Sequence, residues 1–315
     1  MARTYAAPPM DFAALLAPRE PELLRLARDL YASRPDLQKA FPSESAAFCQ
    51  WLAVHGVLEY PALAPFYPPL PPTGLRATVC GGLPMASHLY TGAEDFKMLG
   101  ELFELFAQRP LTSLRSVFDF GCGCARVLRW FQMALPTVPR HGADVRAETI
   151  AWCQHNLVGT YARNATMPPL PFADASMDLT YALSVFSHLS REQNLVWMAE
   201  LARVTKPDGL ILVSTHGAFA LALCARSPEH QSTLQIGADE ARTILRSLAR
   251  ESFAHRVLPA AIRESADGVA DDYGQAFFNE LFARDHWSQF AEFVGCVPCG
   301  LNLFQDMYAL RPRPR

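Results

Sequence analysis

The chain has 315 residues, half of them hydrophobic, which is enough to bury a large core. Its formal net charge of −3 leaves no excess of positive charge for a phosphate backbone, so we expect no nucleic-acid partner. The first residues carry prolines and charges where a secretory segment needs an uninterrupted apolar run, and no later stretch resembles a membrane span. We therefore expect a cytoplasmic protein with no membrane partner.

The eight cysteines lack the two CxxC pairs of a structural zinc site, and most are predicted to be small buried hydrophobes. Cys296 and Cys299 alone have a spacing that is typical of redox or metal sites. No cluster of His, Asp and Glu indicates a metal, so none is expected.

Residues 1–72 are predicted to form a helical N-terminal cap and a connector. The helical spacing of apolar residues in PELLRLARDLY and SAAFCQWLAVHGVL indicates two helices. The segment PALAPFYPPLPP, residues 61–72, is too rich in proline for a helix or a central strand, so we expect an extended connector on the surface. The core domain is then residues 73–315, and GAEDFKMLGELFELFAQRP predicts a helix that ends before Pro110.

Strands and helices alternate from Val117 onward, a pattern that predicts a Rossmann-like, mostly parallel, seven-stranded α/β sheet covered by helices on both faces. The expected strands are 117–120, one ending at Asp144, 161–163, 178–182 and 210–214, and the expected helices between them are 125–135, 148–157 and 191–204. Lys206–Gly209 is predicted to be a turn. Residues 218–275 break the alternation and are predicted to form a helical insertion or lid after strand five, before a helix at 282–293 and a strand in MYAL.

The clearest local motif is Asp119-Phe-Gly121-Cys-Gly123-Cys-Ala125-Arg126, which ends a strand and opens a helix. Glycine lets the backbone turn sharply and approach a ligand, and exposed N–H groups at a helix start favour an anionic group. A dinucleotide fingerprint needs a small residue where Arg126 stands, and the Gly-Lys-Ser/Thr ending of a phosphate loop is absent. The loop nonetheless indicates a ligand of nucleotide type.

Asp144 ends the next expected strand, 23 residues after Gly121. A carboxylate at this position can accept hydrogen bonds from both hydroxyls of a ribose. It can also cap the following helix, and the two roles are compatible.

Four segments in order, DFGCGCARVLRW, HGADVRAETIAWC, PPLPFADASMDLTYALSVFSHL and ELARVTKPDGLILVSTHG, resemble the successive motifs of class I S-adenosylmethionine-dependent methyltransferases over about residues 115–217. The resemblance implies S-adenosyl-L-methionine as the cofactor. It implies that the cofactor-binding residues are Tyr90, Asp119, Gly121, Cys122, Gly123, Asp144, Val145, Asn164 and Ser184. Asn164 would meet the adenine or serve only as a turn residue, and Tyr90 would cover the methionine end or pack the cap.

The loop after strand four would border the methyl group that is transferred. His188 is the candidate catalytic base, because its ordinary pKa of about 6.5 lies near working pH, although it could instead bridge two loops. Phe186, His188, Tyr273, Phe278 and Trp287 are the candidate acceptor contacts, with core packing as the alternative for the aromatic residues. Asp174 and Asp178 are interpreted as structural.

The resemblance implies an enzyme that methylates an O, N or S atom of a small molecule or short peptide. The alternatives are a protein that binds S-adenosylmethionine as a sensor or assembly partner without turnover, and an NAD-dependent oxidoreductase, against which Arg126 argues.

Overall fold

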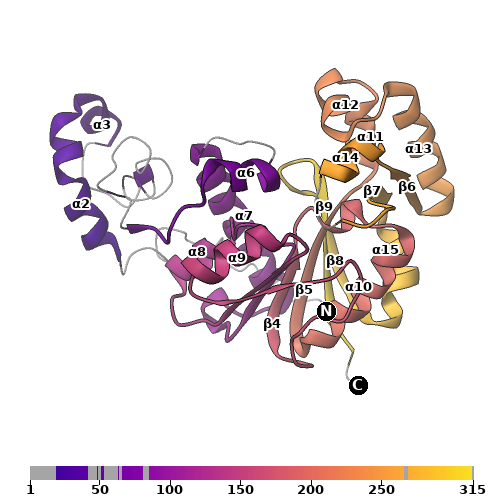
Figure 1. The fold of residues 1–315 in the computed structure, drawn as a ribbon, viewed down its shortest axis with the longest axis horizontal. Coiled ribbons are helices and arrows are strands. Elements are labelled where there is room, and N and C mark those ends of the chain that lie inside the picture. The colour runs from indigo at the N-terminus through magenta and orange to yellow at the C-terminus, as the bar shows by residue number, and fades with distance from the viewer. Residues whose placement is uncertain are drawn as a thin grey trace, which may run out of the picture.

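The computed structural model describes residues 19–41, 48, 51–52, 63, 66–80, 85–265 and 269–313. Helices α2 (Glu20–Ser33) and α3 (Pro35–Ala40) lie at one end of the molecule (Figure 1). Helix α2 agrees with the helix predicted from PELLRLARDLY, whereas most of the second predicted cap helix lies outside the described residues. Within the described ranges, no helix is both long and apolar enough to cross a membrane.

The described part of the proline-rich connector is anchored in the core, contrary to the surface position that we expected. Phe66 and Tyr67 are 1% and 6% exposed, and the Tyr67 hydroxyl donates to the Leu52 carbonyl at 2.8 Å. The buried Arg129 donates to the Pro69 carbonyl at 3.2 Å. Burial of the apolar side chains between the prolines therefore stabilises the packing of this segment against the core.

Two helices lead from the connector to the sheet, α6 (Thr73–Cys80) and α7 (Met85–Ala107), and the turn η4 (Leu111–Ser113) follows them. Helix α7 begins seven residues before Gly92, so it is longer than predicted, and Tyr90, Thr91 and Gly92 lie inside it rather than ahead of it.

Five parallel strands form the centre of the molecule in the order β3-β2-β1-β4-β5. Their bounds are β1 (Val117–Phe120), β2 (Arg140–Asp144), β3 (Thr160–Arg163), β4 (Met177–Ala182) and β5 (Thr205–His216). The helices between them are α8 (Leu128–Ala134), α9 (Ala147–Asn156), the short turn η5 (Phe186–His188) and α10 (Arg191–Val204). This confirms the Rossmann-like α/β sheet, and the strands buried on both faces explain its continuous hydrophobic runs.

Strand β5 is the branch point of the sheet. Strand β9 (Gln305–Pro312) runs antiparallel to it over six residue pairs, and β8 (Ala291–Leu301) adds to β9. Strand β7 (Gly274–Phe278) pairs with β5 only at His216↔Phe277, and β6 (Phe253–Val257) pairs antiparallel with β7. The central sheet thus continues through β9 and β8, and the β6–β7 hairpin is a side branch.

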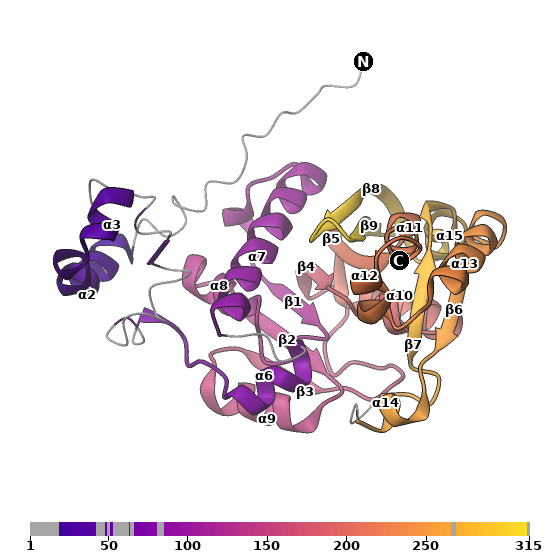
Figure 2. The same cartoon turned by 90° about the horizontal axis from the view of Figure 1, so that it is seen from above.

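The segment predicted as a helical insertion therefore contains strands as well as helices. Its helices are α11 (Ala218–Cys224), α12 (Pro228–Leu234), α13 (Ala238–Glu251) and α14 (Ala260–Ser265). They cluster with the β6–β7 hairpin at the end of the molecule opposite α2 and α3 (Figures 1 and 2). They share a small core, whose buried members include Leu221, Leu248 and Phe277.

The helix predicted at 282–293 was also too long. The structure has α15 (Glu280–His286) and the turn η6 (Trp287–Gln289), after which β8 begins at Ala291. Strand β8 was missed because its residues are mostly half-buried and because Gly295, Pro298 and Gly300, which are uncommon inside strands, interrupt its apolar pattern.

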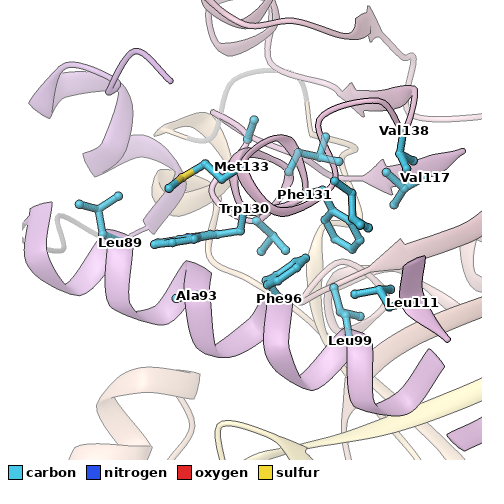
Figure 3. Packing of buried hydrophobic residues seen from close by; sticks show 14 of the residues in the cluster. Leu89, Ala93, Phe96, Leu99, Leu111, Val117, Trp130, Phe131, Met133 and Val138 are labelled. Atoms are coloured by element: carbon cyan, nitrogen blue, oxygen red, sulfur yellow. The ribbon is translucent and has the colours of Figure 1, made fainter. Parts of the chain in front are cut away.

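Two hydrophobic cores lie on the two faces of the sheet, because successive strand residues point to opposite faces. Leu210 and Leu212 belong to the core under α7, α8 and α9, whereas Ile211 and Val213 belong to the core under α10 and α15. Figure 3 shows α7 and α8 packing through the first core, where Phe96 and Phe131 meet edge to face at a centroid distance of 4.8 Å.

The predicted turn at Lys206–Gly209 is instead a bulge within β5. Met177 and Leu179 of β4 pair with Thr205 and Leu210, so four residues of β5 lie opposite Asp178 alone and three of them are extra. The fully buried Asp178 holds the bulge, since it accepts from Lys206 Nζ at 2.5 Å and from the Arg115 N–H at 2.6 Å. Its role is structural, as expected.

Truncating the aromatic contact between α7 and α8 should be costly. We expect Phe96→Ala to lower the free energy of unfolding by about 3–5 kcal/mol, because it leaves a cavity under a fully buried ring. Leu105→Ala on the same helix is the matched control, since Leu105 is 48% exposed and should cost less than about 1 kcal/mol. Urea unfolding measures both, and equal losses would contradict the assignment of this core.

Candidate cofactor and acceptor site

A cavity of about 440 Å³ lies at the carboxyl ends of β1, β2 and β4, the edge at which open α/β sheets bind ligands. Its volume lies in the range of small-molecule sites. Nine residues predicted for the site from sequence line it together: Asp119, Gly121, Cys122, Asp144, Val145, Asn164, Ser184, His188 and Tyr273.

The glycine loop uses its N–H groups differently from our expectation. The N–H groups of Gly121 and Cys122 donate to the Ala143 carbonyl of β2, and that of Gly123 donates to Asp144 Oδ2 at 2.8 Å. They bind the loop to β2 instead of facing a ligand. Gly121 has φ +82°, and a Cβ there would collide with Val185, so glycine is required for the loop after β4 to close against it.

The Asp144 carboxylate is fixed at the cavity wall. Besides the Gly123 N–H, it accepts from the Arg146 N–H at 2.9 Å. Arg146 occupies the N-cap position of α9, so Asp144 braces the turn before the helix but is not its cap residue. A carboxylate has about four acceptor positions, and two remain for a ligand.

Asp119 is a buried carboxyl group at the end of β1. It is 5% exposed and accepts from the Tyr181 hydroxyl at 3.0 Å. Burial raises the pKa of Asp119 to about 7, against the smaller lowering effects of the Tyr181 hydrogen bond and of Arg126. Arg126, also at the cavity wall, is held by the buried Asp95 at 2.5 Å. This end of the cavity therefore suits a ligand group that carries positive charge beside Asp119.

The far end of the cavity carries an amide group and an indole. Asn164 is 6% exposed, and its Nδ2 donates to the Ala165 carbonyl at 2.7 Å. Its buried Oδ1 has no hydrogen-bond partner among the residues that the structure describes. Trp197 lines the same end and donates to the Thr166 carbonyl at 3.1 Å. An unsatisfied buried acceptor is costly, so Asn164 Oδ1 is suited to an amino group of a ligand.

Ser184 follows β4 with φ +57°, an uncommon conformation for a residue with a Cβ. Its N–H donates to Ser214 Oγ at 2.7 Å, and its Oγ accepts from Gln305 Nε2 at 2.8 Å. The Ser214 hydroxyl in turn donates to Gln305 Oε1 at 2.7 Å. This network joins β4, β5 and β9 and sets the course of the loop that carries His188.

His188 lies where this loop meets the insertion. Its Nδ1 is 2.9 Å from the Gly274 carbonyl oxygen, and its ring stacks on Tyr273 at a centroid distance of 4.9 Å and an interplanar angle of 21°. Burial lowers the pKa of His188 below its ordinary value, more than the Gly274 hydrogen bond raises it. The imidazole is therefore neutral at pH 7.

The structure does not bring five of the predicted site residues to the cavity wall. Gly123 lies behind it, where its N–H supports Asp144. Tyr90 is 46% exposed on α7, and its helical neighbour Thr91 lines the cavity instead, because adjacent helix residues point in different directions. The other three, Phe186, Phe278 and Trp287, pack on one another in the core under α10 and α15. Packing is the role that aromatic residues most often have.

Sequence reasoning missed other residues that line the cavity, among them Thr91, Arg126, Arg146, Trp197, Val269, Ala270 and Asn302. For Arg146 a signal existed, since it lies two residues after Asp144. Asn302 comes from the tip between β8 and β9, and nothing local in the sequence links that turn to this cavity.

The paired spacing of Cys296 and Cys299 has no redox signature in the structure. Burial raises the pKa of the Cys296 thiol to about 12 and also raises that of Cys299. Reactive thiols of redox motifs have lowered pKa values. Within the described ranges, no group of three or more His, Cys, Asp or Glu side chains is arranged to hold a metal.

Known proteins that are similar to this chain include one protein family and several solved structures. Residues 117–209 match the family model described as a methyltransferase domain. This segment runs from the start of β1 to the bulge of β5 and includes the glycine loop, Asp144, Asn164 and His188.

Similar solved structures include an S-adenosylmethionine-dependent methyltransferase from Clostridium acetobutylicum, at 9% identity and a TM-score of 0.45 over 72% of this chain and 96% of that one. A protein from Pyrococcus horikoshii has 12% identity and a TM-score of 0.44 over 72% and 95% of the two chains. A methyltransferase from Methanosarcina mazei has 13% identity and a TM-score of 0.42 over 64% and 93%.

The family match indicates a methyltransferase domain over residues 117–209, and the parallel sheet that contains this segment is the Rossmann-like fold expected for it. The match favours this interpretation over the NAD-dependent oxidoreductase.

Burial of Asp119 predicts a pH-dependent stability in the free protein. Because its folded pKa of about 7 exceeds the ordinary value of 3.8, the folded state binds the proton more tightly. The resulting stabilisation is complete below about pH 4 and is lost as pH rises through about 7. Asp119→Asn should remove this loss, whose slope reaches about 1.4 kcal/mol per pH unit. Urea unfolding across this range measures it.

Asp208→Asn is the matched control, because this carboxylate is exposed in the β5 bulge. It should keep the wild-type dependence on pH. If Asp119→Asn and wild type showed the same slope, Asp119 would be ionised in the folded free protein.

Proposed function

We propose that this chain transfers a methyl group from S-adenosyl-L-methionine to an O, N or S atom of a small molecule or short peptide. The observation that carries the proposal is the single cavity in which the glycine loop, Asp144 and Asn164 lie beside His188 and Tyr273. The residues proposed to bind the cofactor and the acceptor thus line one cavity.

The residues at the cofactor end fit this cofactor. Asn164 Oδ1, buried and unpartnered, offers an acceptor to the adenine amino group. The two free acceptor positions of Asp144 suit the ribose hydroxyls. Asp119 offers a carboxylate to the ammonium group of the methionine end, which would lower its pKa from about 7.

When bound, the cofactor supplies an electrophilic methyl group on a sulfonium. The chain contributes alignment and exclusion of water, which are the main requirements of an in-line displacement. Leu183 and Val185 give the cavity an apolar wall next to Ser184, and Tyr273 and Ala270 of the insertion border its other side.

The lining suggests the chemistry of the acceptor. The charged residues among those that line the cavity are Asp119, Arg126, Asp144 and Arg146, and the first three lie on the glycine loop or at the end of β2. His188 stacks on Tyr273, and Leu183, Val185, Leu189, Val269 and Ala270 are apolar residues of the same lining. Such surroundings favour a neutral, largely apolar acceptor over an ionised one.

Cofactor affinity tests the proposal directly. In calorimetric titration we expect saturable binding of S-adenosylmethionine and S-adenosylhomocysteine and none of NADH. Asp144→Ala should weaken S-adenosylhomocysteine at least about tenfold, because hydrogen bonds to a charged group contribute about 1.5–3 kcal/mol.

Glu148→Ala is the matched control, an exposed acid on α9 four residues after Asp144 and not part of the cavity wall. It should bind S-adenosylhomocysteine as wild type does. Circular dichroism of each variant checks that the fold is kept. Undiminished affinity of a folded Asp144→Ala would remove Asp144 from the site, and no binding by wild type would overturn the proposed function.

A further inference from the structure

The return strand of the insertion lies over the carboxyl edge of the sheet, and the pairing of β5 shows why. A strand has two edges for hydrogen bonding. On one edge of β5, β4 ends at the pair Ala182↔Val213, while β9 occupies the other edge as far as His216↔Gln305. The pair His216↔Phe277 therefore places β7 on the edge that β4 leaves open.

This position brings the start of β7 against the loop after β4. Turn η5 packs on β7, and the carbonyl of the Gly274–Gln275 peptide meets the His188 ring. A carbonyl oxygen can only accept a hydrogen bond, so the 2.9 Å contact with Gly274 requires a hydrogen on Nδ1 of His188. Neutral imidazole carries one hydrogen, and its other nitrogen, Nε2, is then an acceptor.

We propose that the Gly274 carbonyl is the positioning group of the methyl-transfer site: it fixes His188 in the Nδ1–H tautomer and leaves Nε2 as the base that takes the acceptor's proton. The acceptor atom therefore carries a hydrogen, as in a hydroxyl, a thiol or a neutral amine. This inference rests on the proposed function and adds the class of acceptor and the role of the insertion.

Stacking holds the ring in this orientation. The Tyr273 ring lies nearly parallel to the His188 ring, so rotation of His188 about its Cβ–Cγ bond would break both the stack and the hydrogen bond. Gly274 itself has no room for a Cβ, which would collide with the Arg256 carbonyl and lie 2.6 Å from His255 Nε2. The peptide that carries the carbonyl is thus confined from the β6 side.

The groups that face His188 keep it neutral. His216 of β5 meets it edge on at 6.4 Å, His255 of β6 lowers its pKa further, and Tyr273 is uncharged because burial raises its pKa. In the described ranges, the hydrogen bond to Gly274 is the one that the His188 side chain makes, and no carboxylate contacts its ring. Its pKa therefore lies below the ordinary 6.5, and Nε2 is free to take a proton at pH 7.

The proton and charge balance is simple. The acceptor atom forms a bond to the methyl carbon as the carbon–sulfur bond breaks, and the electron pair of that bond goes to sulfur. The acceptor's proton passes to Nε2 of His188, and the positive charge moves from sulfur to the imidazolium. Release of this proton to water restores the base.

Nitrogen NMR tests the tautomer without any acceptor. Two-bond ¹H–¹⁵N spectra of the ¹⁵N-labelled full chain at neutral pH show which ring nitrogen of each of the nine histidines carries hydrogen. The signals that disappear in His188→Asn identify His188. We expect the Nδ1–H pattern, with and without S-adenosylhomocysteine. An Nε2–H pattern, or an imidazolium at neutral pH, would overturn the inference.

Two variants of the hairpin extend the test. Gly274→Ala should displace the peptide and shift His188 towards the Nε2–H form that free imidazole prefers. Val257→Ala is the matched control, because Val257 pairs with Gly274 in the hairpin but is 46% exposed. It should leave the His188 signals unchanged. Tyr273→Phe keeps the ring and should keep the tautomer, whereas unchanged His188 signals in a folded Gly274→Ala would show that the carbonyl has no such role.

With an acceptor in hand, His188→Asn should lower kcat by about 10²–10⁴. Its affinity for S-adenosylhomocysteine should remain within about threefold of wild type, since the base is not needed to bind the cofactor product. The two proposals fail separately. If the chain binds S-adenosylhomocysteine but His188 has the Nε2–H form, only the inference is wrong; if it binds no cofactor, the proposed function is wrong whichever tautomer is found.

Discussion

The organisation of this molecule depends on the two edges of β5. This strand extends beyond the end of β4, and the edge that β4 leaves open forms a single residue pair with β7. Through that pair, an insertion of about sixty residues with its own small core is attached to the carboxyl edge of the sheet. The insertion thereby supplies Tyr273 and Gly274 to a site whose other parts come from β1, β2 and β4.

The site holds several groups at a cost to stability. Asp119 is a carboxyl group with a raised pKa, Asn164 has an unsatisfied buried oxygen, and Ser184 has a positive φ. Each costs folding free energy of the order of 1 kcal/mol or more. Their gathering in one cavity is what sets it apart from the two hydrophobic cores, because such strain and burial concentrate where a ligand binds.

Local patterns in the sequence predicted most of the central sheet and the part of the cavity wall formed by the glycine loop and Asp144. Strand β1, the glycine loop and Asp144 follow one another along the chain, so spacing alone predicted that they lie close together. The bulge of β5 could not be predicted from local composition. Lys206–Gly209 has the composition of a turn, but Asp178, which is distant in the sequence, holds this segment in the strand. Likewise, the spacing of Phe278 and Trp287 correctly indicated a shared face, but these aromatic residues pack in the core and do not line the cavity.

The sequence by itself thus determined the class of fold, the position of the glycine loop and the end of β2 at Asp144, because these depend on periodicity and on the needs of tight turns. Only the tertiary structure decided which side of α7 faces the cavity, that β8 and β9 bring Asn302 to its rim, and that Gly274 meets His188 across 86 residues of chain. These contacts are set by strand pairing between remote segments, and no local pattern records which edges will meet.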